Sequence, residues 1–148
     1  MKPRTKARSI ALQVLYEVDI TGHSPAVALE QRLSEDSALD ISLVEFARQI
    51  VFGVLPMIER LDDFIAQHAP EWPLDQVAVI DRNIIRIALW EFAVAGCTPI
   101  KVAINEAIEL AKMYGSDSTP RFVNGVLGSL ASRQAEIKHS LRSMAASK

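Results

Sequence analysis

Residues 99–115, PIKVAINEAIELAKMYG, carry the clearest structural pattern in the sequence. Their apolar side chains recur every three or four residues, which is the period of an α-helix with one buried face. Several of them are alanines, and alternating small and branched side chains allow a neighbouring helix to approach closely. We therefore expect a second helix to pack against the apolar face formed by Ile100, Ala103, Ile104, Ala107, Ile108 and Ala111.

The following segment, residues 120–141, is the natural partner for that face. It has helical periodicity, but Gly125 and Gly128 interrupt it. Each glycine in a helix interior costs about 1 kcal/mol relative to alanine. We expect tight helix–helix contact at both glycines to offset this cost, so that leucine at Gly125 would clash with the preceding helix. The apolar residues of this segment are Val123, Val126, Leu127 and Leu130.

The rest of the chain shows helical spacing and no sustained alternation of apolar and polar residues, which predicts one all-α domain of 148 residues. Gly53 and Pro56 should kink the long pattern 41–68, because proline removes a helical hydrogen bond. The stretch APEWPLD, 69–75, should be a turn-rich connection, and residues 1–4 and 142–148 should be flexible. The predicted helices span about 5–20, 25–33, 41–68, 77–95, 99–114 and 120–141.

Proline and glycine mark where these helices should begin and end. Three dipeptides place a capping residue before a proline, which suits a first helical turn. Three glycines stand where a helix should stop. The predicted caps are Ser24, Thr98 and Thr119, and the predicted stops are Gly22, Gly96 and Gly115.

Composition and charge narrow the class of protein. A chain of this length buries about two-thirds of its unfolded surface. Residues 1–16 carry four positive charges and no negative one, whereas the remainder carries 12 positive and 18 negative charges. No apolar run approaches the roughly 18 residues that span a bilayer, and the start lacks the apolar core of a signal peptide. The single cysteine, Cys97, cannot form an internal disulfide and fits a cytoplasmic location.

The basic opening, MKPRTKARSIALQVLYEVD, predicts either a nucleic-acid contact or a hydrated helix start. On a helical wheel its apolar face runs from Ala7 to Val18, and the opposite side carries Gln13 and Tyr16. Cations neutralise phosphates, and Tyr16 could stack on an unpaired base. The alternative is a solvated polar face with Tyr16 half-buried, and the helix by itself does not decide between them. The cations are Lys2, Arg4, Lys6 and Arg8, with Thr5 and Ser9 on the same polar side.

A second candidate surface lies in DRNIIRIALWEF, residues 81–92. Arg82, Arg86 and Trp90 recur every four residues and could receive a nucleic-acid backbone. The surrounding isoleucines indicate a core helix, however, and Trp90 more often belongs to a core. Tyr114 and Phe122 flank the loop GSDSTPR and either close the core or face a ligand.

Catalysis is not indicated. The histidines His23, His68 and His139 do not have metal-ligand spacing, and no nucleotide-binding or hydrolase motif is present. Asp62 and Asp63 are expected to form a polar helix face. We therefore expect no catalytic residue, no metal site and no cofactor.

Four segments resemble the NusB family of bacterial transcription antitermination factors. They are KARSIALQVLYEVD, VIDRNIIRIALWEF, PIKVAINEAIELAKMYG and RFVNGVLGSL, in the family's order, whereas residues 24–70 match only in helical character. The resemblance implies a NusB-like fold of two small packed helical bundles with about six to seven helices. It implies binding to the boxA element of ribosomal RNA transcripts together with NusE, a small-subunit ribosomal protein, which helps RNA polymerase pass terminators.

The resemblance also implies roles for individual residues. Asn124 and Gly125 match a segment that we assign to packing or capping. The basic arm is sparser than in some relatives, and Ser118 stands where an acidic residue is common. Acids expected to face NusE are Asp81, Glu91 and Glu106. Residues expected to contact RNA are Lys2, Arg4, Lys6, Arg8, Gln13, Tyr16, Arg82, Arg86, Tyr114, Ser118 and Phe122.

Two other functions stay open at this point. The chain could be the NusB-like RNA-binding domain of a ribosomal RNA cytosine methyltransferase, which would need a downstream domain that binds S-adenosylmethionine. It could also be a helical protein–protein module without RNA, which leaves the acid-free opening unexplained. A homodimer that covers the RNA surface, with Trp90 or the residues near Phe52 at its interface, is a further alternative. If the opening binds RNA, Arg8→Glu should weaken binding with little loss of stability.

Overall fold

The structure is a computed structural model that describes residues 1–36, 38–69 and 76–146, with the backbone alone for the last three. All regular elements in these ranges are helical, which confirms the all-α prediction. Apart from Ala69, the predicted connection 69–75 lies outside the described residues. The elements are α1 (Pro3–Thr21), α2 (Pro25–Ser34), α3 (Ile41–Val54), η1 (Leu55–Met57), α4 (Ile58–Gln67), α5 (Val79–Leu89), η3 (Trp90–Ala95), α6 (Ile100–Tyr114), α7 (Thr119–Ala131) and α8 (Gln134–Ala146).

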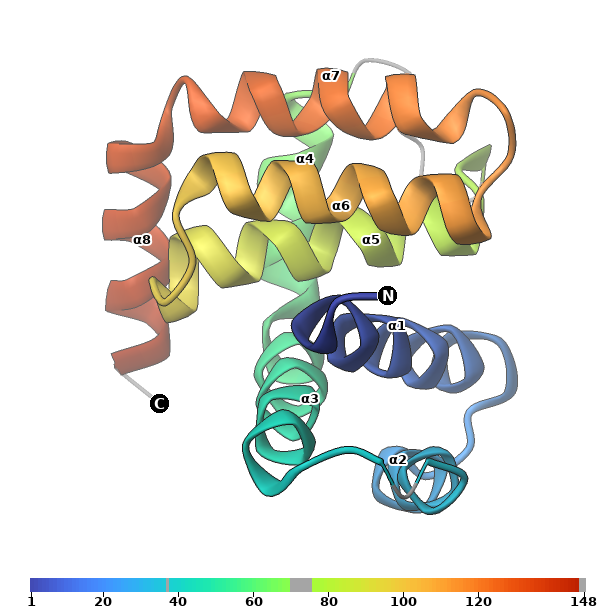
Figure 1. Cartoon of the computed structure of the whole chain (residues 1–148). Coiled ribbons are helices and arrows are strands. Elements are labelled where there is room, and N and C mark those ends of the chain that lie inside the picture. The colour runs from blue at the N-terminus through green and yellow to red at the C-terminus, as the bar shows by residue number, and fades with distance from the viewer. Residues whose placement is uncertain (37, 70–75, 147–148) are drawn as a thin grey trace.

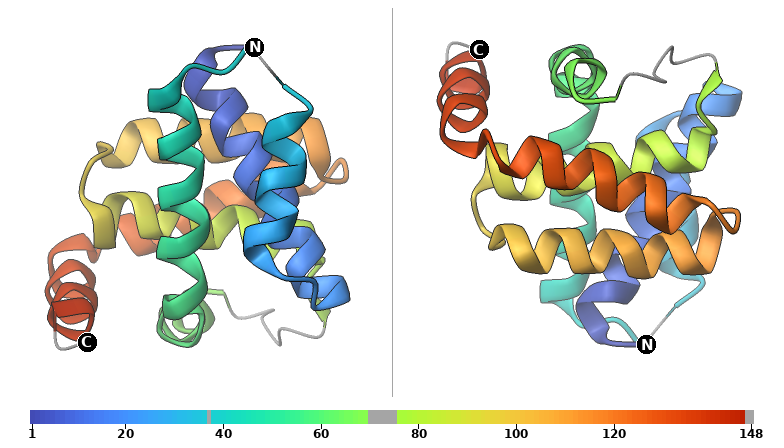
Figure 2. Two further views of the ribbon diagram at one scale, coloured as in Figure 1. Left: turned by 90° about the horizontal axis from the view of Figure 1, so that it is seen from below. Right: turned by 90° about the horizontal axis from the view of Figure 1, so that it is seen from above.

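The helices form two small bundles that pack on each other, as the resemblance implied. Helices α1, α2 and α3 make one layer, and α5, α6 and α7 lie side by side in the other (Figures 1 and 2). Helix α4 continues the line of α3 into the second layer, and α8 crosses one end of it beside η3 (Figure 1). One continuous apolar core joins the two layers.

Helix α1 lies on the side of its layer that faces the second layer, which decides how much of it is buried. It packs against α2 and α3 on one side and against α5 and α6 on the other. Its predicted apolar face is buried, including Ala7, Ala11 and Val14. The expected polar side is not simply solvated, because Thr5 and Ser9 are also buried. A helical wheel identifies the apolar face that packs against one neighbouring layer. It does not show that a second layer covers part of the polar side.

Several predicted helix ends are confirmed. The Ser24 hydroxyl accepts a hydrogen bond from the Val27 N–H at 3.4 Å and caps α2. Gly22 and Gly96 end α1 and η3 with φ of 73° and 66°, a left-handed conformation that glycine adopts without strain. Gly115 ends α6 with extended backbone instead, at φ −91° and ψ −176°.

Two predicted caps are wrong because their hydroxyl groups bind elsewhere. The Thr98 hydroxyl donates to the Glu91 carboxylate at 2.8 Å rather than capping α6. Thr119 lies inside the first turn of α7 and donates to Asp81 at 2.9 Å, while it accepts from the Ser116 N–H. Both threonines therefore connect separate elements.

The long predicted helices are interrupted. Pro56 lies in the 3₁₀ turn η1, which confirms the expected break between α3 and α4. By length and composition alone the run Ile41–Gln67 is apolar enough to cross a membrane, contrary to the expectation from sequence, but its buried face packs in the core. The single helix predicted over 120–141 is wrong: it divides after Ala131, where the Ser132 hydroxyl binds the Ser129 carbonyl in place of helical continuation.

The ends of the chain are more helical than expected. Helix α1 begins at Pro3 and α8 continues to Ala146, so both segments predicted to be flexible contain helical residues. The helix predicted over 77–95 ends in the π-helical turn η3, which the periodicity did not show.

Close packing at a glycine occurs on α3 and not on α7. Gly125 and Gly128 are exposed, and a Cβ added at either would meet nothing within 4 Å, so the expected tight contact there is wrong. At Gly53 an added Cβ would lie 2.3 Å from the indole of Trp90. Trp90 is buried, which confirms its core assignment.

We expect Gly53→Ala to lower the free energy of unfolding by about 1–3 kcal/mol, because the new methyl group overlaps a buried ring. Urea unfolding of the two proteins measures this loss. Gly125→Ala is the matched control and should stabilise by roughly 0.5–1 kcal/mol, because it removes only a glycine penalty. Equal effects of both substitutions would contradict the packing role of Gly53.

Candidate nucleic-acid interface

A polar groove of about 420 Å³ runs between α1, α2 and the end of α6. Lys6, Ser9 and Gln13 lie along its α1 wall, because spacings of three and four residues place them on one helix face. Arg32 contributes from α2, and Tyr114 closes the groove from α6. The groove therefore brings together three elements that are far apart in the sequence.

A chain of hydrogen bonds fixes the polar groups in this groove. The Tyr114 and Ser9 hydroxyls share a hydrogen bond, and the Gln13 amide donates to the Tyr114 oxygen at 3.1 Å. Arg32 donates to the Gln13 carbonyl at 2.9 Å and to Glu17 at 3.1 Å. Gln13 and Tyr114 are thus held in fixed positions on the wall of the groove. Sequence reasoning missed Arg32, whose helix carries no specific motif.

The two tyrosines expose about a third of their surface. Tyr16 is 38% exposed and Tyr114 is 37% exposed. Each ring can therefore offer an edge or part of a face to a planar ligand such as a base.

The four cations of the opening have four different environments. Lys2 is exposed beside α6. The Arg4 guanidinium lies 3.8 Å from the centroid of the Phe46 ring, a cation–π geometry on the surface. Lys6 forms an ion pair with Asp36. Arg8 is buried, so the opening presents three cations to solvent and not four.

Arg8 forms a buried ionic cluster between α1, η3 and α6. Its guanidinium donates twice to Glu91, each at 2.8 Å, and once to Glu106 at 3.0 Å. Arg8 is 2% exposed and Glu91 is 1% exposed. Burial by itself would lower the pKa of Arg8, but the hydrogen bonds and charge of Glu91, together with Glu106, raise it above its ordinary value.

This cluster corrects two predictions. Arg8 has no exposed guanidinium with which to contact a phosphate, and Glu91 is not an exposed acid that could face a partner. The reason is the second layer: α5 and α6 cover the flank of α1 that the helical wheel assigned to solvent. The expectation that Arg8→Glu would cost little stability rests on that exposure; since Arg8 is buried against Glu91, we expect a large loss instead.

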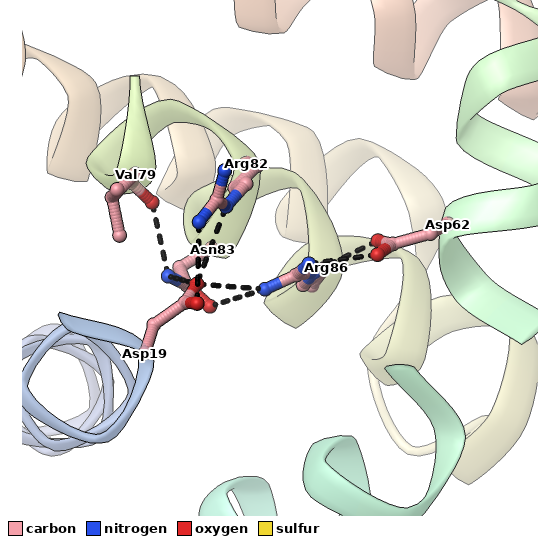
Figure 3. A network of polar contacts seen from close by, with 6 residues as sticks. All are labelled: Asp19, Asp62, Val79, Arg82, Asn83 and Arg86. Carbon is pink, nitrogen blue, oxygen red and sulfur yellow. Dashed lines mark hydrogen bonds and ion pairs between the residues drawn. The ribbon is translucent and has the colours of Figure 1, made fainter. Parts of the chain in front are cut away.

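Arg82 and Arg86 of the second candidate surface are also bound within the protein, in the network of polar contacts that Figure 3 shows. Arg86 is 4% exposed and donates to Asp62 at 2.7 and 2.8 Å and to Asp19 at 3.1 Å. Arg82, partly exposed, donates to both oxygens of Asp19 at 3.2 Å, and Asn83 adds a further bond at 3.1 Å. The network joins α1, α4 and α5, and burial removes Arg86 from the predicted RNA track.

Asp19 and Asp62 anchor the two ends of this network. Burial opposes ionisation of Asp19, but hydrogen bonds from Arg82 and Asn83 outweigh it and hold the pKa of Asp19 below its ordinary value. Asp62 was expected on a polar helix face, whereas its carboxylate is buried against Arg86.

The loop between α6 and α7 forms the rim beyond Tyr114. Ser118 is exposed, and its hydroxyl lies 3.2 Å from that of Ser116. Phe122 is half-buried against the core. Asp81 accepts from Thr119 in α7, and burial raises the pKa of Asp81 although this hydrogen bond opposes the change. Asp81 thus joins α5 to the start of α7 beneath the loop.

A second groove, of about 740 Å³, lies between the start of α1 and α6. Glu106 forms part of its wall, and its side chain, which is 15% exposed, accepts from the Thr5 hydroxyl at 2.8 Å. Its other walls include Lys2, Val102 and Met113, the last two being exposed apolar side chains. This mixed surface adjoins the polar groove, because Met1 borders both.

Within the described ranges, no group of three or more His, Cys, Asp or Glu side chains is placed to hold a metal ion. The fold and these grooves define the class: a small helical protein with a polar surface along its first helix.

The comparisons with known proteins identify the family. The NusB family model matches residues 5–132. Transcription antitermination protein NusB of Roseiflexus sp. (strain RS-1) is 47% identical over 135 residues, covering 90% of this chain and 94% of that protein. The protein of the same name from Bacillus subtilis (strain 168) is 42% identical over 132 residues, covering 89% and 96%. The chain belongs to the NusB family.

Solved structures agree with this assignment. The T. maritima NusB structure superposes with a TM-score of 0.82 at 32% identity, covering 95% of this chain and 99% of that one. A crystal structure of the antitermination factors NusB and NusE in complex with dsRNA superposes with a TM-score of 0.81 at 26% identity, covering 90% and 98%.

Proposed function

We propose that this protein is a transcription antitermination factor that binds the boxA element of ribosomal RNA transcripts together with NusE, and so helps RNA polymerase pass terminators. The observation that carries the proposal is the groove along α1, where Lys6, Gln13 and Tyr114 converge in a member of the NusB family. Action on a nascent transcript would place the protein in the cytoplasm.

The chemistry of the groove supports RNA as the ligand. Unpaired RNA exposes base edges for hydrogen bonds and base faces for stacking. Gln13 offers an amide and Lys6 a cation in the groove, and Tyr16 offers an exposed ring three residues beyond Gln13 on α1. A family structure that contains NusE and dsRNA supports an RNA role and makes a duplex the necessary comparison ligand.

Burial divides the predicted RNA residues into two groups. Arg8 and Arg86 hold the scaffold beneath the surface. Arg82 is partly exposed but bound to Asp19, and we place it at the edge of the track. The residues that we propose for direct contact are Lys2, Arg4, Lys6, Gln13, Tyr16, Tyr114, Ser118 and Phe122.

The NusE contact is proposed at the larger groove. The partly exposed Glu106 carboxylate lies in its wall, and Val102 and Met113 supply exposed apolar area. A basic ribosomal protein could pair its positive charges with Glu106 and pack its apolar side chains against Val102 and Met113. Asp81 contributes indirectly through the α6–α7 rim, and Glu91 is too deeply buried to take part.

The methyltransferase alternative is not favoured. The matched regions cover 94% and 96% of the Roseiflexus and Bacillus subtilis relatives, and both are named as antitermination proteins.

The test is a titration with labelled single-stranded boxA RNA, a scrambled strand and a boxA duplex, each with and without NusE. We expect the single boxA strand to bind most tightly and NusE to strengthen it, with affinity that falls as salt rises. Equal affinity for boxA and scrambled RNA with NusE present would refute sequence-specific recognition.

The same titration tests the stacking role of Tyr16. We expect Tyr16→Ala to weaken boxA binding about tenfold, since a base–aromatic stack contributes about 1–3 kcal/mol. Phe52→Ala is the matched control, because Phe52 is a similarly exposed aromatic residue on α3. A loss of the same size in both variants would assign the effect to altered folding rather than to stacking.

A further inference from the structure

An acidic edge faces the cations of α1 across the polar groove. Glu35 and Asp36 follow the end of α2 and border the groove opposite Lys6. The Lys6 ammonium pairs with the Asp36 Oδ2 atom. The groove thus holds a carboxylate on Lys6, which is one of the three solvent-accessible cations of the opening.

The Asp36 carboxylate is held in this position from its own loop. Its Oδ1 atom accepts a hydrogen bond from the Ala38 N–H at 3.1 Å, while Oδ2 points to Lys6. The hydrogen bond from Lys6 lowers the pKa of Asp36 below its ordinary value, against a smaller opposing effect of burial, so the carboxylate is ionised at neutral pH. The side chain of Asp36 is 18% exposed, compared with 43% for Lys6.

Among Lys2, Arg4, Lys6 and Arg8, Lys6 is the cation that lines the polar groove. It lies on the same α1 face as Ser9 and Gln13, beside the hydrogen-bonded group that includes Tyr114. Arg4 lies over Phe46, and Lys2 borders the larger groove. A strand that follows this face of α1 to Gln13 and Tyr114 passes Lys6 and the carboxylate of Asp36.

We propose that Asp36 is an intramolecular competitor of the RNA backbone: its carboxylate occupies the position on Lys6 that a phosphate takes, and RNA binding requires the Lys6–Asp36 ion pair to break. This rests on the proposed RNA-binding function of the groove. Asp36 then lowers the affinity for RNA and discriminates against polyanions that bind through charge alone. Only a ligand that also contacts Gln13 and Tyr114 gains enough binding free energy to offset the loss of the Lys6–Asp36 ion pair.

The size of the effect follows from the exposure of the pair. Solvent-accessible ion pairs are weak, so competition by Asp36 should lower RNA affinity by about two- to fivefold. Removing the competitor also lets Lys6 neutralise a phosphate without releasing a carboxylate. The slope of log affinity against log salt should therefore become steeper by about 0.7, the value for one phosphate contact on a single strand.

The experiment compares Asp36→Asn with wild type in titrations of single-stranded boxA RNA over a salt series, with NusE present. Asp63→Asn is the matched control, because Asp63 is an exposed aspartate on α4 and its replacement changes the net charge by the same amount. Both substitutions are repeated in a Lys6→Ala background. Thermal unfolding of every variant confirms that it is folded at the titration temperature.

The competitor role predicts that Asp36→Asn tightens binding by about two- to fivefold beyond Asp63→Asn, with the steeper salt slope. It also predicts that this gain disappears in the Lys6→Ala background. Equal affinities of the two asparagine variants, or an undiminished gain without Lys6, would overturn the proposal.

The outcomes separate this inference from the proposed function. If wild type binds boxA RNA and Asp36→Asn matches the control, the competitor role fails and RNA binding stands. If neither wild type nor Asp36→Asn binds any of the RNAs with NusE present, both proposals fail.

Discussion

Replacing Arg8 with alanine is expected to lower the free energy of unfolding by about 3–5 kcal/mol, because it leaves the Glu91 carboxylate buried without its cation. The guanidinium fills a site between α1, η3 and α6 and makes three hydrogen bonds of 2.8–3.0 Å to Glu91 and Glu106. Thr98 would be the one hydrogen-bond donor to Glu91 that remains among the described residues. Urea unfolding followed by circular dichroism measures the loss.

Arg60→Ala is the matched control for this prediction, because Arg60 is exposed on α4. A surface substitution of this kind should change stability by no more than about 0.5 kcal/mol. Arg8→Met combined with Glu91→Leu should recover part of the loss, since apolar replacements of a whole buried pair are often tolerated. A loss below about 1 kcal/mol for Arg8→Ala would contradict the assigned role of the cluster.

The second large effect is expected from Arg86→Ala, which should cost about 3–5 kcal/mol by leaving Asp62 unpaired in the interior. Arg86 also donates to Asp19, so its removal breaks the polar link between α4 and α5 and the link from α4 to the end of α1 (Figure 3). Hydrogen exchange should therefore accelerate in α4 and in the last turns of α1. Urea unfolding gives the overall loss.

Two further variants isolate the network. Arg121→Ala removes an exposed arginine from α7 and should be nearly neutral. Arg86→Lys keeps the charge but cannot donate to both Asp62 oxygens and to Asp19 with one fixed planar group, so it should restore stability only in part. Full restoration by lysine would show that charge alone is required and that the fork geometry is not.

Both predictions affect the interpretation of RNA-binding data. Arg8 and Arg86 lie in sequence segments that imply RNA contact, but their side chains are internal. A weaker RNA affinity in either variant should therefore follow the fraction of folded protein. Tyr16→Ala should instead change affinity at unchanged stability, because Tyr16 is largely outside the core.

The fold class and most helix positions could be predicted from local patterns. The apolar faces of α1 and α6, the cap at Ser24 and the glycine stops at Gly22 and Gly96 depend on residues close in sequence. Breaks that depend on side-chain competition were harder to predict. The turn after Ala131 and the π-turn η3 follow from local hydrogen bonding and packing that periodicity does not contain.

The candidate site shows the same division. The family resemblance implied that Gln13, Tyr16 and Tyr114 contact RNA, and the structure leaves the two tyrosines partly exposed and joins Gln13 to Tyr114. Arg32 and Asp36 escaped notice, because their roles depend on α2 and its following loop lying across α1.

Residue types and short-range spacing were enough to predict an all-helical chain that resembles the NusB family and begins with a cationic helix. Which of those cations reach solvent depends on how the helices pack in three dimensions. Four charges in eight residues look equivalent along one helix, but the layer formed by α5 and α6 covers Arg8 and supplies Glu91 and Glu106 to balance it. A buried charge requires a partner, and such partners can come from residues that are distant in sequence.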